Sequence, residues 1–383
     1  MLVTVHSLPG NNSAKRGSDN GSQRIAILGM EKGNSVLTRL TASICAATIL
    51  AGAAFTPAFA ARSGAGVSLT GAGSSFDFPF FDKAFSVYNS KYGVSVNYQP
   101  KGSGAGIAQF TQKLVNFGAT DVPMNPTSEL PAAVRAGGPV QQIPVALGGI
   151  SIAYNIPGVK TGLHLDGSTL AKIYLGTITN WKDAAIKKLN KKVKLPDLAI
   201  TVVHRSDGSG TSFAFTNYLS KISSQWNGYV GTGKLPNWPV GVGGQANLGV
   251  AQLVQQTSGA IGYVELAYVL QQHMHQAMIE NVRHQFELPS PKTVAADAAS
   301  FKKVSAANFS IVNGRGKNAY PISTYSWLLI YKHQTDATTG KALVKLTEWL
   351  VTTGQKYAAK LEYVALPKTV QQIGLSAAKQ VSF

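Results

Sequence analysis

The stretch His204-Arg205-Ser206-Asp207-Gly208-Ser209-Gly210-Thr211-Ser212-Phe213 joins an apolar run, Leu198 to Val203, to a segment with helical spacing. The apolar run predicts a buried strand, and the spacing of Phe215 and Leu219 predicts a helix. A helix N-terminus offers unpaired backbone N–H groups and the positive end of the helix dipole. Arg205 adds a fork of N–H donors that matches a tetrahedral oxyanion. The stretch therefore predicts a site for phosphate or a similar oxyanion.

Two further segments repeat this arrangement of strand, Gly/Ser loop and helix. Gly71 to Phe76 follows a strand candidate, Val67 to Thr70, and leads into a helical pattern over Phe80 to Tyr88. Gly102 to Gly106 opens a helix around Ile107 to Leu114. A single loop of this kind is usually a turn or a helix cap, but three of them favour an anion site.

The chain has 383 residues, of which 44% are hydrophobic and 14% charged, as in a globular protein with room for two domains. Strand and helix patterns alternate, which predicts an α/β fold with a mostly parallel sheet, and ligands bind beyond the carboxyl ends of such strands. The predicted strands are Val94–Tyr98, Phe117–Thr120, Ile143–Ile156, Ile200–Val203, Ala260–Val264 and Tyr325–Tyr331. The predicted helices include Leu170–Leu175, Trp181–Lys188, Leu248–Thr257 and one long helix over Gly340–Lys360.

The N-terminus has the pattern of an export signal. Two basic residues precede an apolar stretch, Leu40 to Phe55, and Ala58-Phe59-Ala60 forms a cleavage site. We therefore assign residues 1–60 to a signal peptide and an N-terminal extension. Cys45, the only cysteine, lies inside the apolar stretch. Lipid attachment at Cys45 is the alternative, disfavoured because an isoleucine precedes it where a small residue is expected.

The chain is strongly basic, with a formal net charge of +18. Residues 61–383 keep 30 Lys and Arg against 15 Asp and Glu, a net charge of +15. Such a surface attracts anionic solutes or polymers. The densest cluster, Lys187 to Lys194, is best interpreted as a solvated helix end and loop, and no nucleic-acid-binding motif surrounds it.

Six segments resemble the periplasmic phosphate-binding proteins of phosphate-specific ABC transporters. They are Ser68–Phe76, Val96–Gln99, Val115–Asp121, Ile173–Trp181, Asp207–Phe213 and Gly259–Glu265. The resemblance runs from about residue 67 to the C-terminus. It implies an α/β, two-lobed periplasmic-binding-protein fold of type II, with a hinge and a ligand cleft between the lobes. Lobe one would comprise residues 67–145 and 320–383, and lobe two residues 146–319.

The resemblance also implies which residues bind phosphate. Ser75 stands where the family often has threonine, and Gly104 stands where it often has a second serine. The positions that match the family's phosphate contacts are Ser75, Phe76, Ser103, Asp121, Arg205, Ser209, Gly210 and Thr211. By the same resemblance the chain would be an exported, periplasmic monomer that delivers phosphate to ABC permease subunits. It would be no enzyme, and it would need no cofactor, metal or nucleic acid.

Asp121 is unusual in an anion site, because a carboxylate repels an anion. It fits only if the ligand carries a proton to donate to it, as phosphate does near neutral pH and sulfate does not. An unprotonated ligand would leave two acceptors facing each other, so Asp121 predicts phosphate over sulfate. The alternative is a cap or turn residue before Pro123. Arg205 likewise has an alternative role in a salt bridge with Asp207, and both roles are compatible.

A secreted phosphatase or other hydrolase is the main rival function. His204, Asp207 and Ser209 supply the residue types of a catalytic triad. They lie within one strand and turn, where His204 and Arg205 point to opposite faces, so triad geometry is not expected. The chain also lacks a G-x-S-x-G elbow.

Two other patterns are weaker. Gly228 to Lys234 nearly forms a phosphate loop, but Leu235 stands where Ser or Thr must hold magnesium. His273, His275 and His284 have no acidic cluster beside them, so surface histidines are the favoured interpretation over a metal site. An extracellular adhesion or signalling role for the basic surface stays open.

Overall fold

The structure, a computed structural model, describes residues 66–383. The predicted signal peptide and Cys45 lie outside these residues. None of the helices in the described part is long and apolar enough to cross a membrane.

The described residues form one nine-stranded sheet and one three-stranded sheet. In spatial order the large sheet contains β2 (Ser95–Gln99), β1 (Ser68–Gly73), β3 (Phe117–Thr120), β12 (Ser323–Tyr331), β4 (Val140–Tyr154), β8 (Ala260–Glu265), β6 (Thr201–Arg205) and β7 (Val242–Gly244), with β9 (His275–Gln276) beside β4. The small sheet contains β11 (Phe286–Glu287), β10 (Met278–Glu280) and β5 (His164–Leu165).

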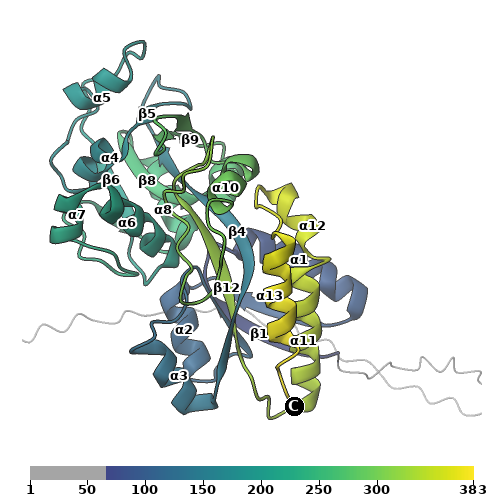
Figure 1. Cartoon of the computed structure of the whole chain (residues 1–383). Coiled ribbons are helices and arrows are strands. Elements are labelled where there is room, and N and C mark those ends of the chain that lie inside the picture. Colours follow the sequence, from purple (N-terminus) through teal and green to yellow (C-terminus); the bar gives the residue numbers. More distant parts are fainter. Residues whose placement is uncertain (1–65) are drawn as a thin grey trace, which may run out of the picture. The chain divides into compact units, whose positions relative to one another are not determined.

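The large sheet is mixed, so the prediction of a mostly parallel sheet is wrong. β1 pairs in parallel with β2 and β3, and β6 pairs in parallel with β7 and β8. Between these groups β4 and β12 run antiparallel to each other and to their outer neighbours. Figure 1 shows β4 and β12 as two long strands through the middle of the described part. β4 pairs with β12 over residues 140–149 and with β8 over residues 150–154, so a single strand joins the two parallel groups.

Helices cover both faces of the large sheet. They are α1 (Phe78–Tyr92), α2 (Ser103–Thr111), α3 (Glu129–Gly137), α4 (Gly167–Tyr174), α5 (Ala184–Leu189), α6 (Gly210–Ile222), α7 (Ser224–Tyr229), α8 (Ala246–Gln256), α9 (Leu266–Gln271), α10 (Pro291–Ala298), α11 (Ala337–Val351), α12 (Gln355–Ala358) and α13 (Lys368–Ala378), with a 3₁₀ turn at Ala359–Leu361.

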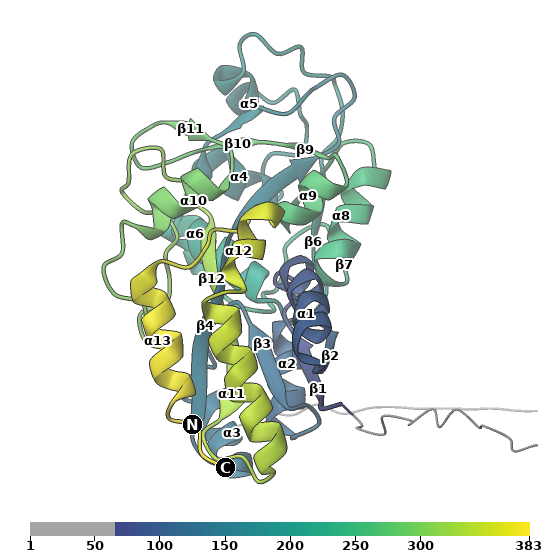
Figure 2. The same ribbon diagram turned by 90° about the vertical axis from the view of Figure 1, so that its right-hand side faces the viewer.

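Neighbouring residues of one strand show how these faces are filled. Leu328 packs in the cluster that holds the apolar side chains of α1 and α11, whereas Leu329 packs with Phe110 of α2 and Ala133 of α3. Successive side chains of a strand point to opposite faces, so α1 and α11 cover one face and α2 and α3 the other. Figure 2 shows α11 between α13 and α1. β12 and β8 are accordingly buried along their whole length, as strands covered on both faces are.

The predicted helix over Gly340–Lys360 is two helices in the structure. α11 ends at Val351, and α12 begins only at Gln355. Gly354 donates its N–H to the Trp349 carbonyl oxygen at 2.7 Å, which closes a turn under the Trp349 ring. The helix predicted from Trp181 also starts later, at Ala184, because Asp183 caps it.

Three strands end beside the predicted anion-binding residues. β1 ends at Gly73, just before Ser75, and β3 ends immediately before Asp121. β6 ends at Arg205 itself and leads into α6. β1 and β3 run in one direction and β6 in the opposite direction, and the carboxyl ends of both groups carry the candidate site.

Candidate anion-binding site

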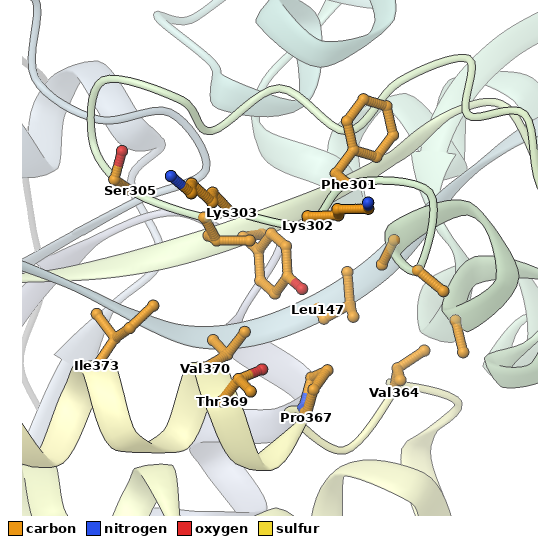
Figure 3. A pocket seen from close by; sticks show the side chains of 15 residues that line it. Leu147, Phe301, Lys302, Lys303, Ser305, Val364, Pro367, Thr369, Val370 and Ile373 are labelled. Carbon is orange, nitrogen blue, oxygen red and sulfur yellow. The ribbon is translucent and has the colours of Figure 1, made fainter.

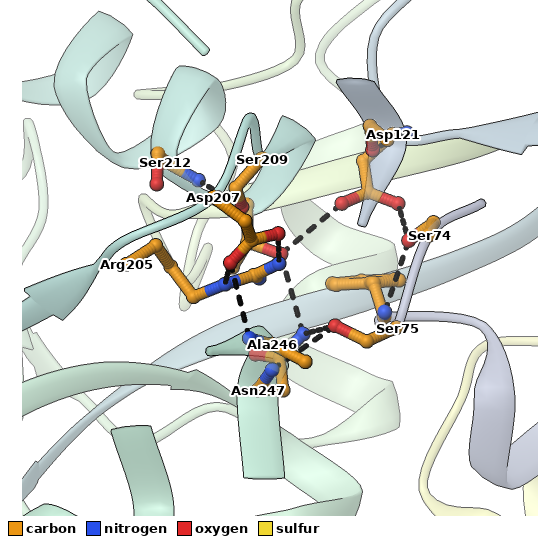
Figure 4. Close-up of polar contacts among 12 residues, drawn as sticks. Ser74, Ser75, Asp121, Arg205, Asp207, Ser209, Ser212, Ala246 and Asn247 are labelled. Atoms are coloured by element: carbon orange, nitrogen blue, oxygen red, sulfur yellow. Dashed lines mark hydrogen bonds and ion pairs between the residues drawn. The ribbon is translucent and has the colours of Figure 1, made fainter. Parts of the chain in front are cut away.

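Asp121 is the centre to which several chain segments converge (Figure 4). Its carboxylate accepts hydrogen bonds from the hydroxyls of Ser74, Thr211 and Ser326, the last two at 3.1 and 3.0 Å. Its backbone N–H donates to Ser103 Oγ at 3.2 Å. The structure thus gathers residues up to 205 positions apart around one buried carboxyl group.

Arg205 is the buried cation of this site, and its side chain is 1% exposed. Its Nε donates to Asp207 Oδ1 at 2.7 Å, and its Nη2 donates to the other oxygen of the same carboxylate. Nη1 reaches Thr211 Oγ1 at 3.5 Å. Asp207 also accepts the Ala246 N–H at 3.0 Å. The proposed salt bridge therefore exists, and it orients the guanidinium toward the hydroxyl that also contacts Asp121.

The N-terminus of α6 lies against Asp121. Ser209 is the N-cap residue, and its hydroxyl accepts the Ser212 N–H at 3.0 Å. Gly210 has no room for a side chain, because a Cβ would lie 2.5 Å from the Asp121 Cβ and 2.8 Å from Ser103 Oγ. The positive end of the α6 dipole is therefore directed at the buried carboxyl and hydroxyl groups.

A second glycine is required where the α2 loop meets Arg205. Gly102 has a φ of +95°, and a Cβ there would overlap Asp207 Oδ2 and lie 3.2 Å from Arg205 Nη2. The next glycine, Gly104, donates its N–H to the Gly208 carbonyl oxygen at 2.7 Å. The two loops interlock through backbone that only glycine allows to approach so closely.

Ser75 and Phe76 join the same network from the end of β1. The Ser75 hydroxyl accepts from the backbone N–H and the side-chain amide of Asn247, both at 3.0 Å. Tyr268 donates its hydroxyl to the Ser75 carbonyl oxygen at 2.7 Å. Phe76 is fully buried, and its N–H donates to Ser74 Oγ at 2.9 Å. All eight residues predicted from the resemblance therefore lie in one connected cluster.

Sequence reasoning missed Asn247, which reaches Thr211 Oγ1 at 3.4 Å as well as Ser75. Its signal was available: Gly243 and Gly244 end β7 just before α8, a fourth junction of strand, glycine and helix. Ser326 carried no such signal, because it lies inside the buried strand β12.

Burial and the neighbouring groups of Asp121 have opposite effects on the pKa of its carboxyl group. Burial raises its pKa, whereas the hydroxyls of Ser74, Ser326 and Thr211 and the charge of Arg205 oppose that rise. Asp121 does not cap a helix, so the alternative interpretation as a cap residue is not supported.

The rival catalytic triad does not form. The His204 ring stacks on Trp238 with centroids 4.9 Å apart, while the Asp207 carboxylate is held by Arg205. Ser209 is engaged as the α6 cap. Among the described residues no group of three or more His, Cys, Asp or Glu side chains could hold a metal ion.

A separate groove of about 540 Å³ lies between the loop after α10 and helix α13 (Figure 3). Lys302 and Lys303 stand on the loop side, while Val370 and Ile373 line it from α13. None of the eight predicted residues lines this groove. The predicted anion-binding residues thus lie in the Asp121 cluster, away from this groove.

Comparison with known proteins gives the family. Residues 60–352 match the model of a PBP superfamily domain. The phosphate-binding protein PstS of Xylella fastidiosa is 43% identical over 80% of this chain and 84% of its own length. The chain belongs to the PstS family. PstS of Haemophilus influenzae is 41% identical over 79% of this chain and 90% of its own length.

Solved structures agree with this PstS fold. The phosphate-binding protein from Stenotrophomonas maltophilia shares 18% sequence identity, with a TM-score of 0.61 over 81% of this chain and 93% of its own. The predicted α/β periplasmic-binding-protein fold is confirmed. PstS proteins are non-enzymatic components of transport, so the expectation that the chain is not an enzyme is confirmed as well.

Proposed function

We propose that this PstS-family chain binds inorganic phosphate within the cluster around Asp121. The observation that carries the proposal is a buried cation and a buried carboxyl, Arg205 and Asp121, which share the Thr211 hydroxyl. The proposed ligands are Ser75, Phe76, Ser103, Asp121, Arg205, Ser209, Gly210 and Thr211. The names of the relatives, all phosphate-binding proteins, support the choice of ligand.

Each part of the cluster has a distinct role in this proposal. Arg205 neutralises the charge of the anion, and Asp207 keeps its guanidinium in place. The first turn of α6 supplies backbone N–H donors and the dipole. Asp121 accepts the proton of the phosphate, which a fully ionised sulfate lacks, so phosphate is preferred.

The proposed lobes divide these ligands evenly. Residues 67–145 and 320–383 would contain Ser75, Phe76, Ser103 and Asp121, and residues 146–319 would contain the other four. An ion pair between Glu129 and Lys234 also crosses the proposed boundary. A bound anion would thus hold the two lobes together around a hinge in β4 and in the segment just before β12.

We further propose that the chain is exported to the periplasm as a monomer and delivers phosphate to the permease of an ABC transporter. The signal-like pattern in residues 1–60 and the family membership support this.

Calorimetric titration of the purified protein, freed of bound anion, tests the proposed ligand. Several charge-assisted hydrogen bonds together give binding of about −8 kcal/mol, which corresponds to a micromolar Kd. We expect phosphate to bind at least this tightly and sulfate to give no heat. Failure to bind phosphate would refute the proposed function.

A further inference from the structure

Asp77 is a buried carboxyl group beside the site that the proposed phosphate contacts do not include. It occupies the N-cap position of α1, yet its side chain makes no capping hydrogen bond. The side chain is fully buried, and its Oδ2 lies 2.7 Å from Ser326 Oγ, within hydrogen-bond distance. Among the described residues Oδ1 has no hydrogen-bond partner. Helix capping therefore does not explain this aspartate.

The Ser326 hydroxyl lies between two carboxyl groups. Its Oγ is 2.7 Å from Asp77 Oδ2 and 3.0 Å from Asp121 Oδ1. A hydroxyl has a single proton, so it donates to only one of them. The other contact is a hydrogen bond only if that carboxyl is protonated and donates to Ser326. The geometry therefore calls for one proton shared by the two aspartates.

The partners of the two carboxyl groups decide where this proton resides. Asp121 receives two further hydroxyl donors, from Ser74 and Thr211, and feels the charge of Arg205. Asp77 has no such partners. Burial and the charge of Asp121 raise the pKa of Asp77 well above its usual value, with only Ser326 opposing. The negative charge thus belongs on Asp121 and the proton on Asp77.

We propose that Asp77 is a positioning residue that holds this proton and, through Ser326, keeps Asp121 ionised as the acceptor for the proton of phosphate. The inference rests on the proposed phosphate site. In this arrangement Asp77 donates to Ser326, and Ser326 donates to Asp121. If Asp77 lost its proton, a second negative charge would face the site and weaken anion binding.

Other titratable groups also face Asp77, and their titration must be distinguished from that of Asp77. Glu265 is buried nearby, and burial raises its pKa to about 8. The hydroxyls of Tyr98, Tyr268 and Tyr363 have pKa values raised by burial, so they stay neutral when Asp77 titrates. Because Glu265 titrates as well, the pH dependence of phosphate binding in wild type alone does not identify Asp77. The effect of Asp77 is the difference between the pH profiles of wild type and Asp77→Asn.

The test compares wild type, Asp77→Asn and a matched control, Asp82→Asn, which changes an exposed aspartate of the same helix. The phosphate Kd of each protein is measured by calorimetry from neutral to alkaline pH. Bound phosphate favours the protonated form of Asp77, so in wild type the Kd rises by up to about tenfold per pH unit once Asp77 ionises. We expect Asp77→Asn to lose this part of the rise and Asp82→Asn to keep it. Phosphate ionises identically in all three experiments, so its own titration cancels.

Identical pH profiles for wild type and Asp77→Asn would overturn the inference while leaving the proposed function intact. Wild type that binds no phosphate would instead refute the proposed function. Asp77→Ser provides a second neutral variant, and it should show the same loss. Asn and Ser are neutral and no larger than Asp, and the Asp77 side chain makes no capping hydrogen bond, so both variants should fold. Failure of both to fold would contradict the claim that Asp77 is neutral and not needed as a cap.

Discussion

Replacement of Arg205 by alanine separates the structural role of this residue from its role in binding. The guanidinium is the main partner of Asp207, whose side chain is only 11% exposed. Without it the Asp207 carboxylate keeps, within residues 66–383, only the Ala246 N–H as a hydrogen-bond partner. Removing one member of a buried ion pair costs about 3–5 kcal/mol, because the other charge is left uncompensated. We expect Arg205→Ala to lower the free energy of unfolding by an amount in this range.

Binding should weaken by a different amount and for a different reason. Arg205 would donate at least one charge-assisted hydrogen bond to phosphate, which contributes about 1.5–3 kcal/mol. Its loss corresponds to an affinity about tenfold to about a hundredfold lower.

The double variant Arg205→Ala/Asp207→Ala distinguishes the two effects. It removes the stranded carboxylate, so urea unfolding should recover part of the lost stability. Calorimetry should show no recovery of phosphate affinity. An unchanged titration curve for Arg205→Ala would refute its role as a ligand. A double variant no more stable than the single one would refute the explanation by an uncompensated charge.

Two further predictions follow from burial and backbone geometry. Gly102→Ala should weaken phosphate binding, and it should lower the free energy of unfolding by more than the strain of its positive φ alone. The control Gly158→Ala has φ +78° and nothing near the added Cβ, so it should lower the free energy of unfolding by only about 1–2 kcal/mol. Equal losses of stability in thermal unfolding of the two variants would contradict the steric explanation. Burial raises the pKa of Glu265 to about 8, so stability should fall from about pH 4.5 to about pH 8 by up to about 1.4 kcal/mol per unit. Glu265→Gln should remove the part of this fall that Glu265 causes. Urea unfolding of both proteins at pH 5 and pH 9 tests this, and an equal fall in wild type and variant would contradict it.

Local sequence signals located most of the site. The Gly/Ser junctions at Gly71–Phe76, Gly102–Gly106 and Asp207–Ser212 identify loops at strand ends. The structure brings them together because β6 runs in the direction opposite to β1 and β3, so the carboxyl ends of the two strand groups converge, as the hydrogen bond from Thr211 to Asp121 shows. The apolar patterns likewise located β1, β2, β3, β4, β6, β8 and β12 to within a few residues, whereas the short strands β5, β7, β9, β10 and β11 were not predicted.

Contacts between distant segments could not be predicted in this way. Asp77 and Ser326 are 249 residues apart, and their contact depends on β12 lying antiparallel beside β3. The sequence of a strand buried on both faces does not indicate its direction, so the antiparallel pairing of β4 and β12 could not be predicted from their apolar patterns. The break after α11 depends on how Gly354 packs under Trp349, which helical periodicity does not encode.

The selectivity of Asp121→Asn tests the central claim most directly. Phosphate and sulfate are titrated in turn into wild type and the variant, and the ratio of the two affinities is compared. The account predicts that wild type rejects sulfate and that the amide, which can donate a hydrogen bond, admits it, so the ratio collapses. A variant that still binds phosphate and rejects sulfate would contradict the role of Asp121 as the acceptor of the ligand's proton.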